Sequence, residues 1–73
     1  MMHEAELRKG GIYVWRLGDP AHQATLIVTQ ITKHLVYAKL IEKGEPVGKR
    51  FFNDKGMFLQ ECTPSSAGAS HGD

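Results

Sequence analysis

The sequence from Ala24 to Glu42, ATLIVTQITKHLVYAKLIE, decides the fold of this 73-residue chain. It consists of two apolar, β-branched runs that are separated by the polar break Thr32-Lys33. A helix would have to accommodate several β-branched side chains in close succession, and each of them loses χ1 freedom against the preceding turn. The stretch therefore predicts a β-hairpin in the middle of the chain.

Side-chain alternation in the hairpin indicates which faces are buried. In Leu35 to Lys43, a period of two divides the side chains between two faces, with Val36, Ala38 and Leu40 on one and Tyr37, Lys39 and Ile41 on the other. We expect the even-numbered face to be the core face. In the preceding run, Leu26 and Val28 share a face and Ile27 and Ile31 lie opposite. Because that opposite face is half apolar, the strand is either covered on both sides or presents hydrophobic surface to a partner.

Three further strands are expected around the hairpin. They are Gly11 to Leu17, before the turn at Gly18-Asp19-Pro20; Val47 to Phe52, after the turn at Lys43 to Pro46; and Met57 to Cys62. The segment from Asn53 to Gly56 is expected to be a tight connection in which Gly56 is free to take a positive φ, with a short 3₁₀ turn near Asn53 as the alternative. The sequence thus predicts an all-β fold, either a small five-stranded antiparallel meander or an SH3-like barrel. A sheet of three or four strands with a loose fifth segment is the alternative.

The chain is expected to have three parts. Residues 1–9 form a flexible or short helical segment, residues 10–62 the small β domain, and residues 63–73 a disordered tail. The tail contains no large apolar residue, so burial cannot offset the entropy of ordering it. A domain of this size buries only about 60% of its unfolded surface, so marginal stability is expected.

The positively charged residues all lie in the central part of the chain. The whole sequence has a net charge of +1, with nine Lys and Arg against eight Asp and Glu. Glu4, Glu6 and Asp73 lie outside the segment from Leu7 to Cys62, which contains all nine basic residues. This mildly basic body is compatible with contact to a nucleic acid or to an acidic protein surface.

No motif in the sequence indicates catalysis. The four histidines, His3, His22, His34 and His71, form no close ligand pair with one another or with Cys62. We expect Cys62 to be a small buried apolar residue. No phosphate-binding or dinucleotide motif occurs. The interpretation is a protein without enzymatic activity, cofactor or metal. The absence of a signal-like or membrane-length apolar run predicts a cytoplasmic protein that does not act at a membrane.

Aromatic, apolar and basic residues of the expected strands are the candidate partner-binding residues. Protein hot spots and nucleic-acid stacking platforms share this mixture of residue types. The candidates are Tyr13, Trp15, Arg16, Ile27, Tyr37, Lys39, Lys49, Arg50 and Phe52. The alternative is that the aromatic residues fill the core, which we expect for Trp15, and that the basic residues are ordinary solvated positions.

The layout of the chain resembles a known group of viral proteins. The sequence from Lys9 to Trp15, KGGIYVW, leads into the hairpin at Ala24 to Glu42 in a chain of 73 residues. In these respects it is similar to the small bacteriophage-encoded regulators that bind the RNA polymerase of Xanthomonas hosts. The resemblance implies binding to the N-terminal part of the polymerase β′ subunit, inhibition of initiation through loss of the σ factor, and antitermination.

The sequence is compatible with three functions. The leading hypothesis is a monomeric phage protein that binds RNA polymerase in the host cytoplasm and regulates transcription. The second is a small nucleic-acid-binding barrel that contacts RNA or DNA. The third is a phage structural or assembly protein, for which stable self-association is expected.

Overall fold

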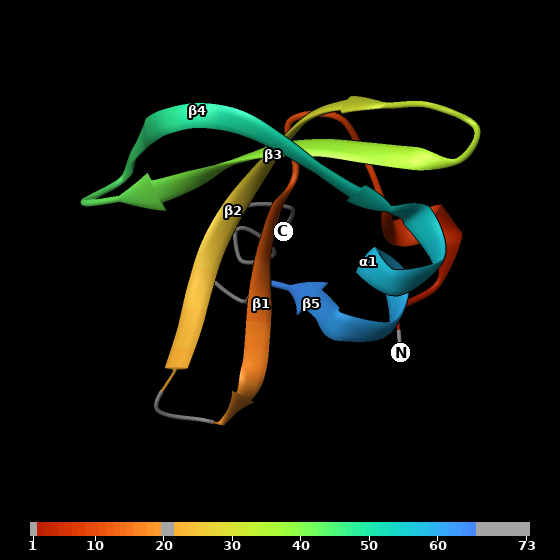
Figure 1. Ribbon diagram of the computed structural model, residues 1–73, viewed down its shortest axis with the longest axis horizontal. Helices are drawn as coiled ribbons and strands as arrows, with labels where there is room; N and C mark the ends of the chain where they lie inside the picture. The colour runs from red at the N-terminus through yellow and green to blue at the C-terminus, as the bar shows by residue number, and fades with distance from the viewer. Residues whose placement is uncertain (1, 20–21, 66–73) are drawn as a thin grey trace, which may run out of the picture.

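One antiparallel sheet contains all five strands, in the spatial order β4-β3-β2-β1-β5. The computed structural model describes residues 2–19 and 22–65 (Figure 1). The strands are β1 (Ile12–Asp19), β2 (His22–Ile31), β3 (Leu35–Glu42), β4 (Glu45–Asp54) and β5 (Cys62–Pro64). The predicted all-β fold with one five-stranded antiparallel sheet is confirmed, and β5 pairs with β1 rather than with β4.

The sheet is strongly bent. Figure 1 shows the β3–β4 hairpin running across the β1–β2 hairpin. The chain then returns through a short helix, and β5 pairs with β1 through the registers Val14–Thr63 and Trp15–Cys62. Among the described residues, β4 and β5 form the two ends of the sheet.

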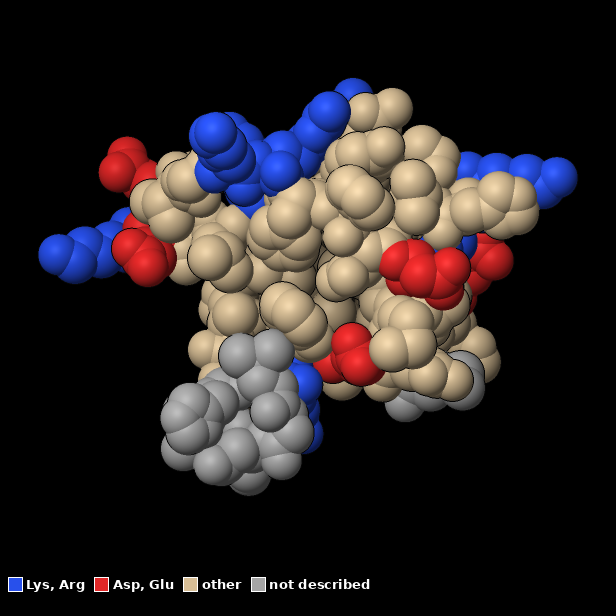
Figure 2. All heavy atoms as spheres, in the orientation of Figure 1, with Lys and Arg blue, Asp and Glu red and all other residues tan. Residues whose placement is uncertain are grey.

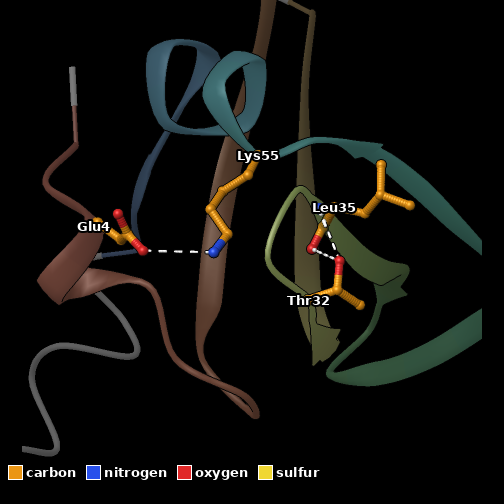
Figure 3. Close-up of polar contacts among 4 residues, drawn as sticks. All are labelled: Glu4, Thr32, Leu35 and Lys55. Carbon is orange, nitrogen blue, oxygen red and sulfur yellow. Dashed lines mark hydrogen bonds and ion pairs between the residues drawn. The ribbon is translucent and has the colours of Figure 1, made fainter.

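Two turns define the central hairpins. Between β2 and β3, the Thr32 backbone N–H donates to the Leu35 carbonyl at 2.8 Å, and the Leu35 N–H donates to the Thr32 hydroxyl at 2.9 Å (Figure 3). Between β3 and β4, Lys43 and Gly44 have φ angles of 53° and 81°. A two-residue turn with both φ angles positive matches the twist of the flanking strands. The hairpin predicted from Ala24 to Glu42 is confirmed.

A bulge in β2 changes the predicted face of Ile31. The register shifts between Val28 and Gln30, so that Ile31 pairs with Val36 and packs against the core. An extra residue in one strand reverses the alternation beyond it. The prediction that Ile31 lies on the same face as Ile27 was therefore wrong.

The core lies on one face of the sheet. Its buried strand residues are Tyr13, Leu26, Val28, Val36, Ala38 and Cys62. Phe58 from the helix and Met2 and Leu7 from the N-terminal segment cover them. Leu40 was expected in the core, because it shares the parity of Val36 and Ala38. It is 39% exposed because it lies at the turn end of β3, beyond this cover.

The predicted strand at Met57 to Cys62 is a helix, α1 (Lys55–Glu61). Asp54 caps it, because its carboxylate accepts a hydrogen bond from the Met57 N–H at 3.2 Å. Phe58 is 1% exposed and anchors the helix in the core. Gly56 lies within this helix rather than in a tight connection; among the described glycines, positive φ angles occur at Gly10, Gly44 and Gly48.

The ends of the domain extend further than the sequence predicted. A short 3₁₀ helix, η1 (Glu4–Glu6), forms in the N-terminal segment, and the Met2 N–H donates to the Leu59 carbonyl at 2.8 Å. An ion pair of 3.4 Å joins Lys55 to Glu4 (Figure 3). Thr63 and Pro64, predicted to begin the disordered tail, belong to β5. Ser65, also in the predicted tail, is buried, and its N–H donates to the Ile12 carbonyl at 3.0 Å. Residues 66–73 of the predicted tail lie outside the described residues.

Candidate functional site

The face of the sheet opposite the core is the candidate functional site, here called the outer face. Strand register and alternation assign to it positions from four strands, none of which is among the buried core residues. They are Ile12, Val14 and Arg16 from β1; Gln23, Thr25, Ile27 and Gln30 from β2; Leu35, Tyr37, Lys39 and Ile41 from β3; and Pro46, Arg50, Phe52 and Asp54 from β4. The outer face is thus a mixed apolar, aromatic and basic surface.

Six of the nine predicted partner-binding residues share this face. They are Arg16, Ile27, Tyr37, Lys39, Arg50 and Phe52. Lys49 is exposed beside them, in the irregular part of β4 between Val47 and Phe51. The sheet therefore brings together residues that are up to 36 positions apart in the sequence, from Arg16 to Phe52.

Two predicted residues lie on the core face instead. Tyr13 is only 3% exposed, and its hydroxyl donates to the Glu6 carbonyl and accepts from the Arg8 N–H. Trp15 is half-buried, as the burial alternative expected, and its ring centroid lies 6.4 Å from that of Phe51. We therefore exclude Tyr13 and Trp15 from the candidate surface.

Four side chains from three strands form an aromatic–cation cluster on the outer face: Gln30, Tyr37, Arg50 and Phe52. Tyr37 and Phe52 are cross-strand partners, with ring centroids 5.8 Å apart and ring planes inclined by 51°. The guanidinium carbon of Arg50 lies 4.6 Å from the centroid of the Tyr37 ring. The Arg50 guanidinium also donates a hydrogen bond to Gln30 Oε1 at 3.2 Å. These contacts restrain Arg50 above Tyr37.

The bulge in β2 explains why the sequence did not identify Gln30. Strict alternation would place Gln30 with Leu26 and Val28, on the core face. The register shift turns its side chain to the face of Tyr37 instead. No local sequence signal marks this bulge, because Thr29 is a common strand residue.

Phe52 is the most exposed of the large apolar residues on this face. Its side chain is 60% exposed. Another large exposed side chain, Met57, is 47% exposed but belongs to α1, and it provides a matched control outside the outer face. An exposed aromatic ring held between strands is typical of a binding contact.

The cluster lies in a positively charged part of the surface. The ion pair between described side chains joins Lys55 to Glu4, so Lys39, Lys49 and Arg50 have no carboxylate partner within the described part of the chain. Figure 2 shows Lys and Arg side chains gathered above the region where β4 crosses the sheet. Asp54 follows Phe52 at the end of β4, where its carboxylate is engaged in capping α1.

Two further features of the described residues lie outside the outer face, at Cys62 and beside Tyr13. Burial, assisted by the negative charge of Glu61, raises the pKa of the Cys62 thiol from 9.0 to about 12, which disfavours the nucleophilic thiolate. Within residues 2–19 and 22–65, no three His, Cys, Asp or Glu side chains gather as metal ligands would. A hollow of about 310 Å³ lies between the N-terminal segment, Tyr13 and the end of β5, away from the cluster.

The described helices are too short or too polar to span a membrane. No protein family, curated protein or solved structure matches this chain, so the outer face is the basis for its functional interpretation.

Proposed function

We propose that this protein is a phage-type transcription regulator that binds host RNA polymerase. The proposed target is the N-terminal region of the β′ subunit, and the proposed effects are displacement of the σ factor, inhibition of initiation and promotion of antitermination. The protein acts as a monomer in the host cytoplasm and performs no reaction. The partner is proposed from the resemblance in sequence layout, and the outer face is the proposed binding surface.

A single observation supports a macromolecular contact: six predicted binding residues share one sheet face on which no buried core residue lies. Two of the six, Arg16 and Ile27, lie on β1 and β2, and Arg is enriched at the centres of protein interfaces. The β1–β2 part of this face presents the half-buried side chains of Ile12, Val14 and Ile27 beside the exposed Arg16. This part is the proposed contact with the polymerase.

The experiment uses the full chain and purified host polymerase. We expect the chain to co-elute with the core enzyme and with an isolated N-terminal fragment of β′, and to release σ from the holoenzyme. In transcription assays, it should lower initiation from σ-dependent promoters and increase read-through at a terminator. If the chain fails to bind both the core enzyme and the β′ fragment, the proposal is wrong.

Paired variants connect the binding to the outer face. The double variant Arg16→Glu, Ile27→Thr removes a positive charge and a hydrophobic contact while keeping a β-branched residue in β2. If this is the contact, polymerase affinity falls by about tenfold or more, as for interface residues that carry binding energy. Met57→Ala and Lys33→Glu are the controls, since Met57 belongs to α1 and Lys33 to the β2–β3 turn. Equal losses in the control variants would contradict the assignment.

A further inference from the structure

We infer that the aromatic–cation cluster of Gln30, Tyr37, Arg50 and Phe52 binds single-stranded nucleic acid. This inference goes beyond polymerase binding and stands without it, because Tyr37, Arg50 and Phe52 lie on β3 and β4, and Gln30 lies beyond the bulge near the end of β2. The proposed polymerase contact lies on the β1–β2 part.

The first argument is the exposed ring of Phe52. Its side chain is 60% exposed, and the ring of Tyr37 lies beside it across the β3–β4 pairing. A ring restrained on a sheet and open to solvent can stack on an unpaired base, since every base presents a π-face. In a duplex the bases are already stacked on one another, so this contact requires a single strand.

The second argument is the arrangement of cations around the ring. Arg50 is held over Tyr37 by the cation–π contact at 4.6 Å and by its hydrogen bond to Gln30. Lys39 lies two residues along β3 from Tyr37, and Lys49 precedes Arg50 in β4. All three cations lack a carboxylate partner among the described side chains. Backbone phosphates spaced along a strand would satisfy this charge.

The same arrangement argues against an aliphatic peptide at this position. On the outer face, Tyr37 lies across from Phe52 in the β3–β4 pairing, and Arg50 precedes Phe52 by two residues. Leu35 and Asp54 pair beyond it, and the Asp54 carboxylate caps α1. An apolar side chain docked on Phe52 would cover the Arg50 guanidinium without giving it an anionic partner, which is unfavourable. A nucleotide provides both a base for the ring and a phosphate for the guanidinium.

The test measures binding of the full chain to fluorescently labelled oligouridylate and oligothymidylate of about 12 nucleotides, which lies within the site sizes of small single-strand binders. Fluorescence anisotropy is recorded between roughly 50 and 200 mM salt, together with a duplex of the same length. Three phosphate contacts predict a salt slope of about −2, which is a loss of affinity of about 18-fold over this range. The duplex should bind more weakly than the single strands.

Substitutions at Phe52 separate stacking from general hydrophobic contact. Phe52→Trp keeps a stacking ring and should retain affinity, whereas Phe52→Leu keeps an apolar side chain and should lose about fivefold or more. Met57→Ala, on α1, should bind like the unmodified chain. Replacing Lys39 or Lys49 by Ala should make the salt slope less negative by about 0.7 for each lost contact. Circular dichroism and urea unfolding confirm that each variant is folded.

Three results would overturn the inference: no binding of either oligonucleotide at about 50 mM salt, equal affinity for the duplex, or unchanged affinity in Phe52→Leu. The polymerase assay distinguishes the proposed polymerase binding from the proposed nucleic-acid binding. If Phe52→Leu loses oligonucleotide binding and retains polymerase binding, the inference is supported. If it loses polymerase binding while the chain binds no oligonucleotide, the cluster is a protein contact and the inference is wrong.

Discussion

The hydroxyl of Tyr13 donates a hydrogen bond of 2.7 Å to the backbone carbonyl of Glu6. This bond connects the N-terminal segment to β1. The same hydroxyl accepts a hydrogen bond of 2.8 Å from the Arg8 N–H. The buried phenol of Tyr13 thus satisfies two backbone groups at the edge of the core. Partly buried backbone groups need such partners, because leaving them unpaired is costly.

Tyr13→Phe should destabilise the fold. The substitution keeps the ring and leaves the Glu6 carbonyl and the Arg8 N–H without this partner, so we expect the free energy of unfolding to fall by about 1 to 3 kcal/mol. Urea unfolding monitored by tryptophan fluorescence measures the change. Tyr37→Phe is the matched control, because its hydroxyl belongs to the outer face, and it should cost less than half as much. Equal effects would contradict the role of the Tyr13 hydroxyl.

Gly11→Ala should also lower stability, for a steric reason. A Cβ atom at Gly11 would lie 2.5 Å from the Tyr13 hydroxyl oxygen and 2.8 Å from the ring. The ring is buried and cannot move aside freely, so we expect a loss of about 1 to 3 kcal/mol. In the double variant Gly11→Ala, Tyr13→Leu, the shorter side chain relieves the contact. The Gly11→Ala penalty, measured by urea unfolding in that background, should therefore be smaller. An equal penalty in both backgrounds would show that the contact is not its cause.

Phe58→Ala should have the largest effect on stability of these substitutions. Phe58 is 1% exposed and makes an edge-to-face contact with Tyr13 at 5.6 Å between ring centroids. Truncating a buried Phe costs about 3 to 5 kcal/mol, a large fraction of the stability of so small a domain. Near-ultraviolet circular dichroism and thermal unfolding should show a largely unfolded chain at 37 °C. Met57→Ala, the neighbouring residue on α1, should remain folded, and similar losses in both variants would contradict the anchoring role of Phe58.

Cys62 should remain protonated and unreactive in the folded protein. Its side chain is 1% exposed, and its pKa is raised to about 12 by burial and by Glu61. We expect slow alkylation by iodoacetamide at pH 8 and rapid alkylation in urea. Fast alkylation of the folded chain would show that the thiol is accessible.

The same pKa shift predicts how stability depends on pH. Below pH 9 the thiol is protonated in both states, so its titration contributes nothing. Between pH 9 and about 12 the unfolded chain releases this proton first, so the thiol lowers stability as pH rises. The difference in unfolding free energy between the unmodified chain and Cys62→Ala should therefore change over this range. A constant difference would contradict the raised pKa.

The position of some candidate-site residues on one face of the sheet was predictable from side-chain alternation along the strands. Strands at the centre of the chain put Tyr37 and Lys39 on one face and Val36 and Ala38 on the other, as the structure confirms. The sequence could not assign Tyr13 to the core, because both faces of its strand carry apolar residues. That assignment depends on Phe58, Leu7 and Met2, which reach the sheet from elsewhere in the chain.

The sequence by itself determined the central hairpin, the two strands before and after it, and the alternation of β3. These follow from local β-branched and alternating patterns, which depend on neighbouring residues. The tertiary structure alone decided that the segment from Lys55 to Glu61 is a helix, because a single short helix is stabilised by its Asp54 cap and by burial of Phe58 rather than by intrinsic propensity. It also decided that Gln30 joins Arg50 on the outer face. A bulge of one residue reverses the side-chain alternation, and its position is set by the pairing of β2 with β3.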